Sequence, residues 1–375
     1  MLTAELLCNA KTDHEEGIDM TINMFPILDG HNDTLTRIYE THAKGGRDFF
    51  TQSSQGHIDL PRAQQGGFAG GFFAIFSPDA TQDQIMTENL VIGEANYEIR
   101  PIPAIDPAMA QQYTRAVVAY LFQLEAQSEG KIKVVRTIDE LLHCIQNNIL
   151  AIILHIEGAE AIDPQLNALE VFYQAGLRSL GIVWSRPNAF GHGVPFKYPH
   201  SPDTGPGLTQ AGQELVLACN RLGIMLDLSH INEQGFWDVA RLSEHPLAVT
   251  HTAAHALCPS TRNLTNHQLE AIKESKGIVG LNFDVAGLRG DAAMDANTSI
   301  EIMVRHIDYL VEHLGIESVG FGSDFDGGIT VIHEIGDVAG LPRLIDALRK
   351  RGYNDTALRR LTHENWIRVL RETWK

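Results

Sequence analysis

LTQAGQELVLACNRLGIMLDLSHINEQGFWDVARLSEHPLAVTH (208–251) contains the pattern that decides the fold. Good helix formers fill 208–222, and a short, mostly apolar run follows at 223–230. A second helical pattern at 232–243 leads to a second apolar run at 247–251. Both runs are apolar on both faces, as expected of parallel strands that are buried on each side. This stretch therefore predicts an α/β protein built on a parallel sheet.

The same alternation extends outward in both directions along the chain. Six more apolar runs have the length of strands, at 25–31, 70–76, 151–158, 180–184, 277–283 and 319–325. Further helical patterns lie at 165–176, 265–276 and 299–314. Eight strands that alternate with helices predict an α/β fold of the (β/α)8 TIM-like barrel type. The alternative is an open doubly wound sheet, but no G-x-G-x-x-G follows the first strand.

The domain organisation follows from this alternation. We assign 1–24 as an irregular N-terminal lead-in and 25–375 as a single (β/α)8 barrel domain. The stretch 185–207 is rich in Pro, Gly and His, and it is long enough to be a functional loop over the mouth of the barrel.

Composition and charge exclude several classes of partner. The chain has 29 Lys and Arg against 47 Asp and Glu, a formal net charge of −18, which disfavours nucleic acid and anionic membrane surfaces. No apolar run approaches the length of a membrane span, and the acidic first twenty residues do not resemble a signal peptide. We therefore predict no nucleic-acid or membrane partner and a cytoplasmic location.

Ionisable residues gather where the predicted strands end. The positions are Asp29, His31 and Asp33 on the first strand, Glu157 on the third, His230 on the fifth, His251 on the sixth and Asp324 on the eighth. In a barrel of this type, the carboxyl ends of the strands form the face on which active sites are built. The sequence therefore predicts a polar site at this face.

The residue types at these strand ends indicate a dinuclear metal site. His31 and Asp33 are two residues apart on an extended segment, so their side chains point the same way. Imidazole and carboxylate groups suit zinc, but three His with two acids are too many for one catalytic zinc that needs an open position. They suffice for two metals that share a carboxylate, and Glu157 lies on the strand between the two groups. We predict two Zn²⁺ per chain.

Six segments together resemble the renal (membrane) dipeptidase family of zinc peptidases, within the amidohydrolase superfamily. They are DGHND (29–33), HIDLPR (57–62), HIEGAEAI (155–162), DLSH (227–230), VTHTAAHALCPSTRN (249–263) and GFGSDFDGG (320–328). The intervals of 21 residues from His230 to His251 and of 11 residues from His251 to Arg262 fit the family pattern. The resemblance runs from about residue 25 to the end of the chain.

The resemblance implies a role for each of these residues. It assigns His31 and Asp33 to one zinc, His230 and His251 to the other, and Glu157 as the bridge. Asp324 matches the residue that shuttles a proton beside a hydroxide bridging the metals. Arg262 matches the arginine that binds the free carboxylate of a dipeptide, and a guanidinium is well suited to bind a carboxylate bidentately. The implied activity is hydrolysis of dipeptides, including L-Xaa-D-Xaa such as L-Ala-D-Ala, by a homodimer.

One position departs from the family pattern. The better-known members of the family have a His after the fourth strand that touches the scissile carbonyl oxygen, whereas this chain has Trp184 in VWSRPN. The ring of Trp184 is suited to wall the substrate pocket but not to take that polar role. His192, eight residues later, either replaces this His or is a structural residue of the loop, and both alternatives stay open.

The remaining candidate residues are predicted to have structural roles or to lie on the surface. His57 and Asp59 precede the second strand, so we expect structural roles for them. His143, His306 and His313 fall on helical patterns and are predicted on the outer surface. Two other functions stay open: a different amidohydrolase, such as an N-acyl-D-amino-acid hydrolase or a lactonase, and a catalytically silent barrel. The complete ligand set and Asp324 argue against the silent barrel.

Overall fold

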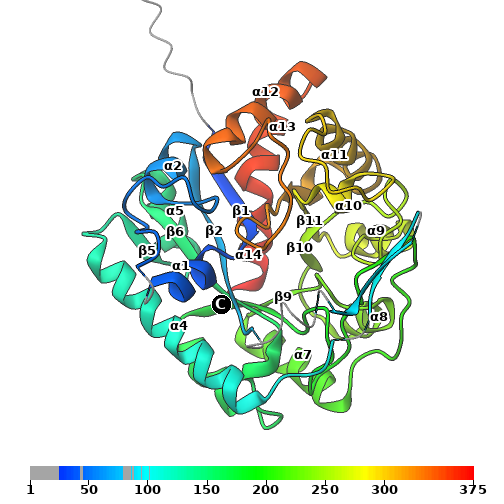
Figure 1. The fold of residues 1–375 in the computed structure, drawn as a ribbon. Coiled ribbons are helices and arrows are strands. Elements are labelled where there is room, and N and C mark those ends of the chain that lie inside the picture. The colour runs from blue at the N-terminus through cyan, green and yellow to red at the C-terminus, as the bar shows by residue number, and fades with distance from the viewer. Residues whose placement is uncertain (1–24, 43–44, 79–85, 87, 94, 101) are drawn as a thin grey trace, which may run out of the picture.

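Parallel strands close into a barrel in chain order, and helices surround them (Figure 1). The barrel strands are β1 (Ile27–Asn32), β2 (Phe68–Phe76), β6 (Leu150–Glu157), β7 (Leu177–Gly181), β9 (Met225–Asp227), β10 (Ala248–Thr252), β11 (Ile278–Leu281) and β12 (Val319–Phe321). β2 pairs with both β1 and β6, which closes the ring. Each strand overlaps one of the predicted runs, so the (β/α)8 barrel is confirmed.

The structure, a computed structural model, describes residues 25–375 except 43–44, 79–85, 87, 94 and 101. The predicted lead-in at 1–24 lies outside the described residues, and the assignment of one domain stays a prediction. None of the described helices combines the length and the apolar character that crossing a bilayer requires.

The helices lie between successive strands and beyond the last one. They are α1 (Thr34–His42), α2 (Leu60–Gln65), α4 (Pro107–Gln127), α5 (Ile138–Gln146), α6 (Asn167–Ala175), α7 (Gln210–Leu222), α8 (Glu233–Leu242), α9 (Asn266–Glu274), α10 (Val285–Leu288), α11 (Glu301–Leu314), α12 (Leu341–Arg351), α13 (Asp355–Arg359) and α14 (Asn365–Thr373), with the short turns η1 (Ala159–Ala161), η2 (Ile316–Ser318), η3 (Val338–Gly340) and η4 (Arg360–Glu364). The five predicted helical patterns correspond to α6, α7, α8, α9 and α11.

Local sequence signals set the ends of α7. The side chain of Thr209 accepts a hydrogen bond from the backbone N–H of Gly212, which satisfies one of the free donors of the first turn. The helix ends at Gly223, whose φ of 72° is the left-handed conformation that glycine adopts at low cost. The chain then enters β9 directly, so the caps also position the strand.

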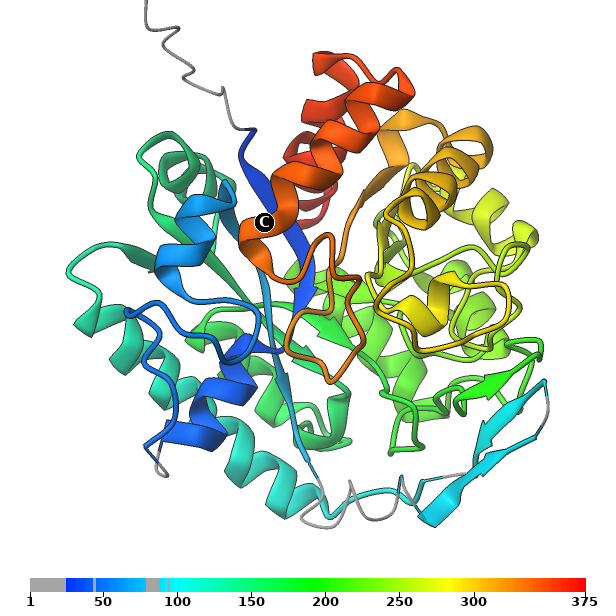
Figure 2. The same ribbon diagram turned by 45° about the horizontal axis from the view of Figure 1, so that its top comes forward.

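Two smaller pieces of sheet accompany the barrel. β5 (Ile132–Val134) pairs with the first half of β6. β3 (Leu90–Ile92), β4 (Tyr97–Ile99) and β8 (Lys197–Tyr198) form an antiparallel sheet at the side of the barrel (Figure 2). β8 belongs to the long loop predicted at 185–207. Its Lys197 exchanges hydrogen bonds with Thr261, so this loop is held against the segment that carries Arg262.

Trp366 of α14 closes the amino-terminal end of the barrel. It is fully buried, and its indole N–H donates to the carbonyl of Phe321 at 3.0 Å. Gly30 and Gly320 face it from β1 and β12, and a Cβ on Gly320 would lie only 2.7 Å from the indole nitrogen. The ring therefore fills space that these strands leave by having no side chain. The opposite end of the barrel stays available for a site.

We expect Trp366→Ala to be strongly destabilising, because it opens a large cavity inside the barrel. Truncation of a buried aromatic residue costs about 3–5 kcal/mol of unfolding free energy. Trp237→Ala is the control, because Trp237 is only partly buried and its ring lies against His267 near the surface. Urea unfolding of the two variants measures the difference, and equal losses would contradict the role assigned to Trp366.

Candidate metal centre

A bulge in β1 turns His31 into the mouth of the barrel. Ile27 packs in the large core cluster with the helices, whereas Leu28 packs in the interior cluster with Trp366. Simple alternation would therefore turn His31 outward with Ile27. The register shifts between Asp29 and Asn32, where three steps along β1 match two along β2. Such a bulge reverses the facing of the residues that follow it. His31 and Asp33 then share the inward face.

The same device operates in β10. Ala248 packs in the interior cluster and Val249 in the outer one, so alternation would place His251 outside. The register between β10 and β11 shifts between Val249 and Thr252, and His251 lies within the shifted segment. β6 needs no such shift, because Glu157 has the same parity as the interior residue Ile153. Three strands thus direct ligand-type side chains to one point.

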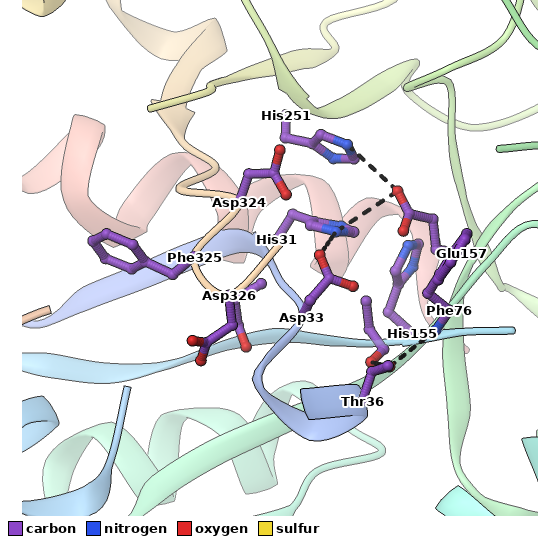
Figure 3. A network of polar contacts seen from close by, with 12 residues as sticks. His31, Asp33, Thr36, Phe76, His155, Glu157, His251, Asp324, Phe325 and Asp326 are labelled. Atoms are coloured by element: carbon purple, nitrogen blue, oxygen red, sulfur yellow. Dashed lines mark hydrogen bonds and ion pairs between the residues drawn. The ribbon is translucent and has the colours of Figure 1, made fainter. Parts of the chain in front are cut away.

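One oxygen of Glu157 lies at the centre of this group. Its Oε1 is 3.1 Å from His230 Nε2, 3.5 Å from His251 Nε2 and 3.8 Å from His31 Nε2. Asp33 Oδ2 lies 3.5 Å from the same nitrogen of His31. Figure 3 shows the side chains of His31, Asp33, Glu157 and His251 turned toward one another, with the carboxylate of Asp324 alongside. All five predicted ligands therefore meet at the mouth.

The described residues form two candidate metal-binding triads that share Glu157. One is His31, Asp33 and Glu157, and the other is Glu157, His230 and His251. A third combination, His31, Asp227 and His251, also has its ligand atoms close together. The first two triads have the arrangement that the sequence predicts, with one carboxylate between two pairs.

The chemistry of these groups fits divalent metal ions. Neither ring nitrogen of the fully buried His31 makes a hydrogen bond within the described residues. Burial holds the pKa of His230 and of His251 well below its usual value, so both are neutral, as metal ligation requires. Burial also raises the pKa of Glu157 well above its usual value. A bound cation would offset this cost and favour the carboxylate.

Hydroxyl groups orient two of the imidazoles. Ser185 Oγ lies 2.8 Å from His230 Nδ1, and Thr250 Oγ1 lies 2.9 Å from His251 Nδ1. The Nε2 atoms thereby face Glu157, since a second hydrogen bond commonly fixes the ring of a ligating His. Asp227 supports this arrangement by accepting from the hydroxyls of Ser229 and Thr250. The sequence assigned no role to Asp227, although its place in DLSH was a signal.

Asp324 borders the ligand group on the side of β12. Its backbone adopts φ 60°, and its N–H donates to the carbonyl of His31 at 2.9 Å. Burial raises the pKa of Asp324 to about 7, with His31 lowering it and Asp33 raising it further. Asn282 Nδ2 donates to Asp324 Oδ2 at 2.9 Å. The sequence missed Asn282, although it lies near the end of the strand predicted at 277–283 and has the inward parity of Ile278.

Arg262 has no carboxylate partner among the described residues. Its Nη2 donates to the carbonyl of His251 at 3.3 Å, and no ion pair to it forms within the described part of the chain. Burial lowers the pKa of its guanidinium, while the charges of Asp324 and Glu157 raise it. A guanidinium so placed can take an anionic group of a ligand.

Trp184 and His192 differ in their relation to the site. The ring of Trp184 lies 5.7 Å from that of His230 and packs against Phe76 and Phe196, at 4.9 and 5.5 Å. It thus forms an aromatic wall next to a candidate ligand. His192 Nδ1 lies 3.5 Å from the carbonyl oxygen of Gly207. Among the described residues, no hydrogen bond or ion pair links it to the candidate ligands.

The predicted structural roles agree with the structure, but one of the predicted surface positions does not. Asp59 caps α2 by accepting from the backbone N–H of Arg62, and His57 Nδ1 accepts from that of Asp326, as structural roles predict. His143 is exposed, but the prediction of an outer-surface position for His306 is wrong. His306 is fully buried, where its Nε2–H donates to Leu288 O at 2.8 Å. Its side of α11 is covered by α10, which the helical pattern alone does not indicate.

The fold and the site define a metal-dependent hydrolase of the (β/α)8 type. Residues 16–375 match the sequence profile of the membrane dipeptidase family (peptidase family M19), and the chain belongs to this family. It is therefore a metallo-dipeptidase, a hydrolase of peptide bonds that uses a metal cofactor.

Relatives of known sequence or structure span most of the chain. A metallopeptidase from Rhodobacter sphaeroides, solved with a phosphinate mimic of the dipeptide L-Ala-D-Ala, is 48% identical with a TM-score of 0.89, over 94% of this chain and 100% of that one. The dipeptidase AC is also 48% identical, with a TM-score of 0.88, over 94% of this chain and 99% of that one. An uncharacterized protein in the pqqA 5′ region of Klebsiella pneumoniae is 48% identical over 69% of this chain and 95% of its own length.

We expect Glu157→Ala to lose metal from both triads, because its carboxylate belongs to each. The variant should still fold, since a core of this size does not depend on metal. His230→Ala is the matched comparison, because it removes a ligand from one triad and should weaken one site. Elemental analysis of metal per chain, with circular dichroism to check folding, gives the result. Full metal content in Glu157→Ala would rule out the shared carboxylate.

Proposed function

We propose that this metallo-dipeptidase holds two Zn²⁺ per chain and hydrolyses dipeptides, including L-Xaa-D-Xaa such as L-Ala-D-Ala. The observation that carries the proposal is the pair of buried triads that share Glu157. In this assignment His31 and Asp33 hold one zinc, and His230 and His251 hold the other. Nitrogen and oxygen donors of these types are those that zinc prefers.

The bound metals would supply Lewis acidity to activate water and polarise the scissile carbonyl. Asp324 takes the proton that the attacking water gives up and delivers it to the nitrogen of the leaving amino acid as the C–N bond breaks. Its position next to His31 and Asp33 supports this role.

Arg262 fixes the length of the substrate. Its guanidinium, unpaired among the described residues, binds the C-terminal carboxylate of the dipeptide. Peptides that continue beyond the second residue would lack a carboxylate at this point. Trp184 walls the pocket next to His230, and its packing against two Phe rings supports an apolar contact with substrate. His192 stays a weaker candidate for substrate contact.

The proposed tolerance of a D residue at the C-terminal position of the substrate rests on similarity to a relative of known structure. The Rhodobacter sphaeroides metallopeptidase, 48% identical to this chain, was solved with a mimic of L-Ala-D-Ala. The open alternatives are an N-acyl-D-amino-acid hydrolase, a lactonase and a silent barrel. No feature of the described residues favours them over a dipeptidase. The homodimer and the cytoplasmic location stay predictions of the sequence.

The substrate assay separates these functions. We expect zinc-loaded protein to hydrolyse L-Ala-D-Ala and to act on N-acetyl-L-Ala-D-Ala much more slowly. Each substrate is followed by the D-alanine that it releases. Equal rates on the two substrates would favour the acyl-amino-acid hydrolase. Failure to hydrolyse any member of a library of L,L- and L,D-dipeptides at full zinc content would favour the silent barrel.

Arg262→Met tests the carboxylate contact. Loss of one partner of a desolvated charge pair costs roughly 2–5 kcal/mol, so kcat/KM on L-Ala-D-Ala should fall accordingly. The dipeptide amide, which lacks that charge, should be hydrolysed about equally by the wild type and the variant. Arg221→Met, at an exposed ion pair with Glu170, is the control. Equal losses on acid and amide would mean that Arg262 supports structure instead.

A further inference from the structure

Asn282 reaches the mouth of the barrel directly after β11. Ile278 packs in the interior cluster and a Cβ on Gly280 would meet Trp366, so the even positions of this strand face inward. Asn282 continues that face and is the next inward residue toward the carboxyl end. Its backbone N–H donates to the carbonyl of Thr252 at 2.8 Å, which holds it beside β10. The side chain therefore arises from a fixed point on the barrel.

The two ends of the Asn282 amide have different partners, and these settle its orientation. Nδ2 lies 2.9 Å from Oδ2 of Asp324. Oδ1 accepts from the backbone N–H of Asp284 at 2.6 Å. A backbone N–H can only donate, so the oxygen of the amide must face Asp284 and the NH₂ group must face Asp324.

The segment behind Asn282 is itself held in place. Asp284 caps α10, and its Oδ1 accepts from the backbone N–H groups of Ala286 and Thr330. Val285 N–H donates to the carbonyl of Thr330 at 2.9 Å. The amide of Asn282 is thus anchored to a bonded turn and not to a free loop, so it can constrain the carboxylate that it contacts.

The contact makes the two oxygens of Asp324 unequal. Oδ2 accepts from an amide donor, which leaves Oδ1 without that contact. Oδ1 borders Gly327, and a Cβ at this glycine would meet both Asp324 Oδ1 and Asp33 Oδ2. Asp324 Oδ1 therefore lies on the same side as Asp33 Oδ2, next to Gly327, whereas Oδ2 of Asp324 is turned to Asn282.

We propose that Asn282 is a positioning residue for hydrolysis, which holds Oδ2 of Asp324 so that Oδ1 faces the ligand group and exchanges the proton. This inference rests on the proposed function of Asp324. Within the described part of the chain, Asn282 makes no hydrogen bond to a candidate metal ligand. Its effect on the reaction passes through the orientation of one carboxylate.

A double-mutant cycle with zinc-loaded protein and L-Ala-D-Ala tests the proposal. Asn282→Ala should lower kcat by about 10- to 100-fold and change KM by less than about threefold, because misdirected proton transfer affects the chemical step. Zinc content should equal that of the wild type. In the Asp324→Asn background, Asn282→Ala should lower kcat by less than about twofold, because the group that it orients no longer carries the proton.

Two further variants separate orientation from general structure. Asn282→Leu keeps the approximate size of the side chain and removes the donor without adding a charge, so it should show the same loss in kcat even if Asn282→Ala folds poorly. Asn220→Ala is the control: its buried amide donates to Leu242 O at 2.8 Å and accepts from the Glu244 N–H at 3.2 Å, outside the mouth. It should lower stability and leave kcat unchanged.

The possible outcomes are distinct. Losses that multiply in the double variant, or zinc loss in Asn282→Ala, would overturn the positioning role. Wild-type turnover in Asp324→Asn would overturn the proposed function of Asp324 and with it this inference. A low kcat in Asp324→Asn together with wild-type turnover in Asn282→Leu would leave the function standing and reject only the role of Asn282.

Discussion

The concentration of buried ionisable groups at one mouth of the barrel is the constraint on which the site depends. Oε1 of Glu157 lies within 3.8 Å of three imidazoles, and the carboxylates of Asp33 and Asp324 are close by. Burial of a carboxylate is costly unless a cation compensates for it. Bound metal ions would provide that compensation. The buried groups that are unfavourable at this end of the barrel without metal are therefore the groups that would bind it.

The amino-terminal end of the barrel contributes to stability, whereas the carboxyl-terminal end carries the candidate site. At the amino end, Trp366 fills the interior and glycines on β1 and β12 make room for it. At the carboxyl end, the strands carry polar groups that could not be packed in an apolar core. This division is general for barrels of this type, in which the carboxyl-terminal face bears the chemistry. Asp324, at this carboxyl-terminal end, has a backbone φ of 60°, in a sparsely populated region that is common at functional sites.

Three groups at the mouth, His230, His251 and Asp324, are oriented by polar neighbours that do not bind metal in the proposed assignment. Ser185 and Thr250 fix two imidazoles, and Asn282 fixes the carboxylate of Asp324. These contacts matter because a catalytic arrangement tolerates only small displacements. In the proposed assignment, the ligand set determines which reaction is catalysed. The rate also depends on neighbouring residues that the sequence motifs do not identify.

The sequence by itself determined the order of strands, the helices between them and the residue types at the strand ends, because apolar period and cap residues are local properties. Tertiary structure decided which way those residues face. By parity alone, His31 would follow Ile27 and His251 would follow Val249 to the outside, but register shifts in β1 and β10 turn both inward. Likewise, the burial of His306 and the contact of Asn282 with Asp324 depend on neighbours distant in the chain. Such pairings arise only when strands register against one another and the barrel closes, so no local pattern encodes them.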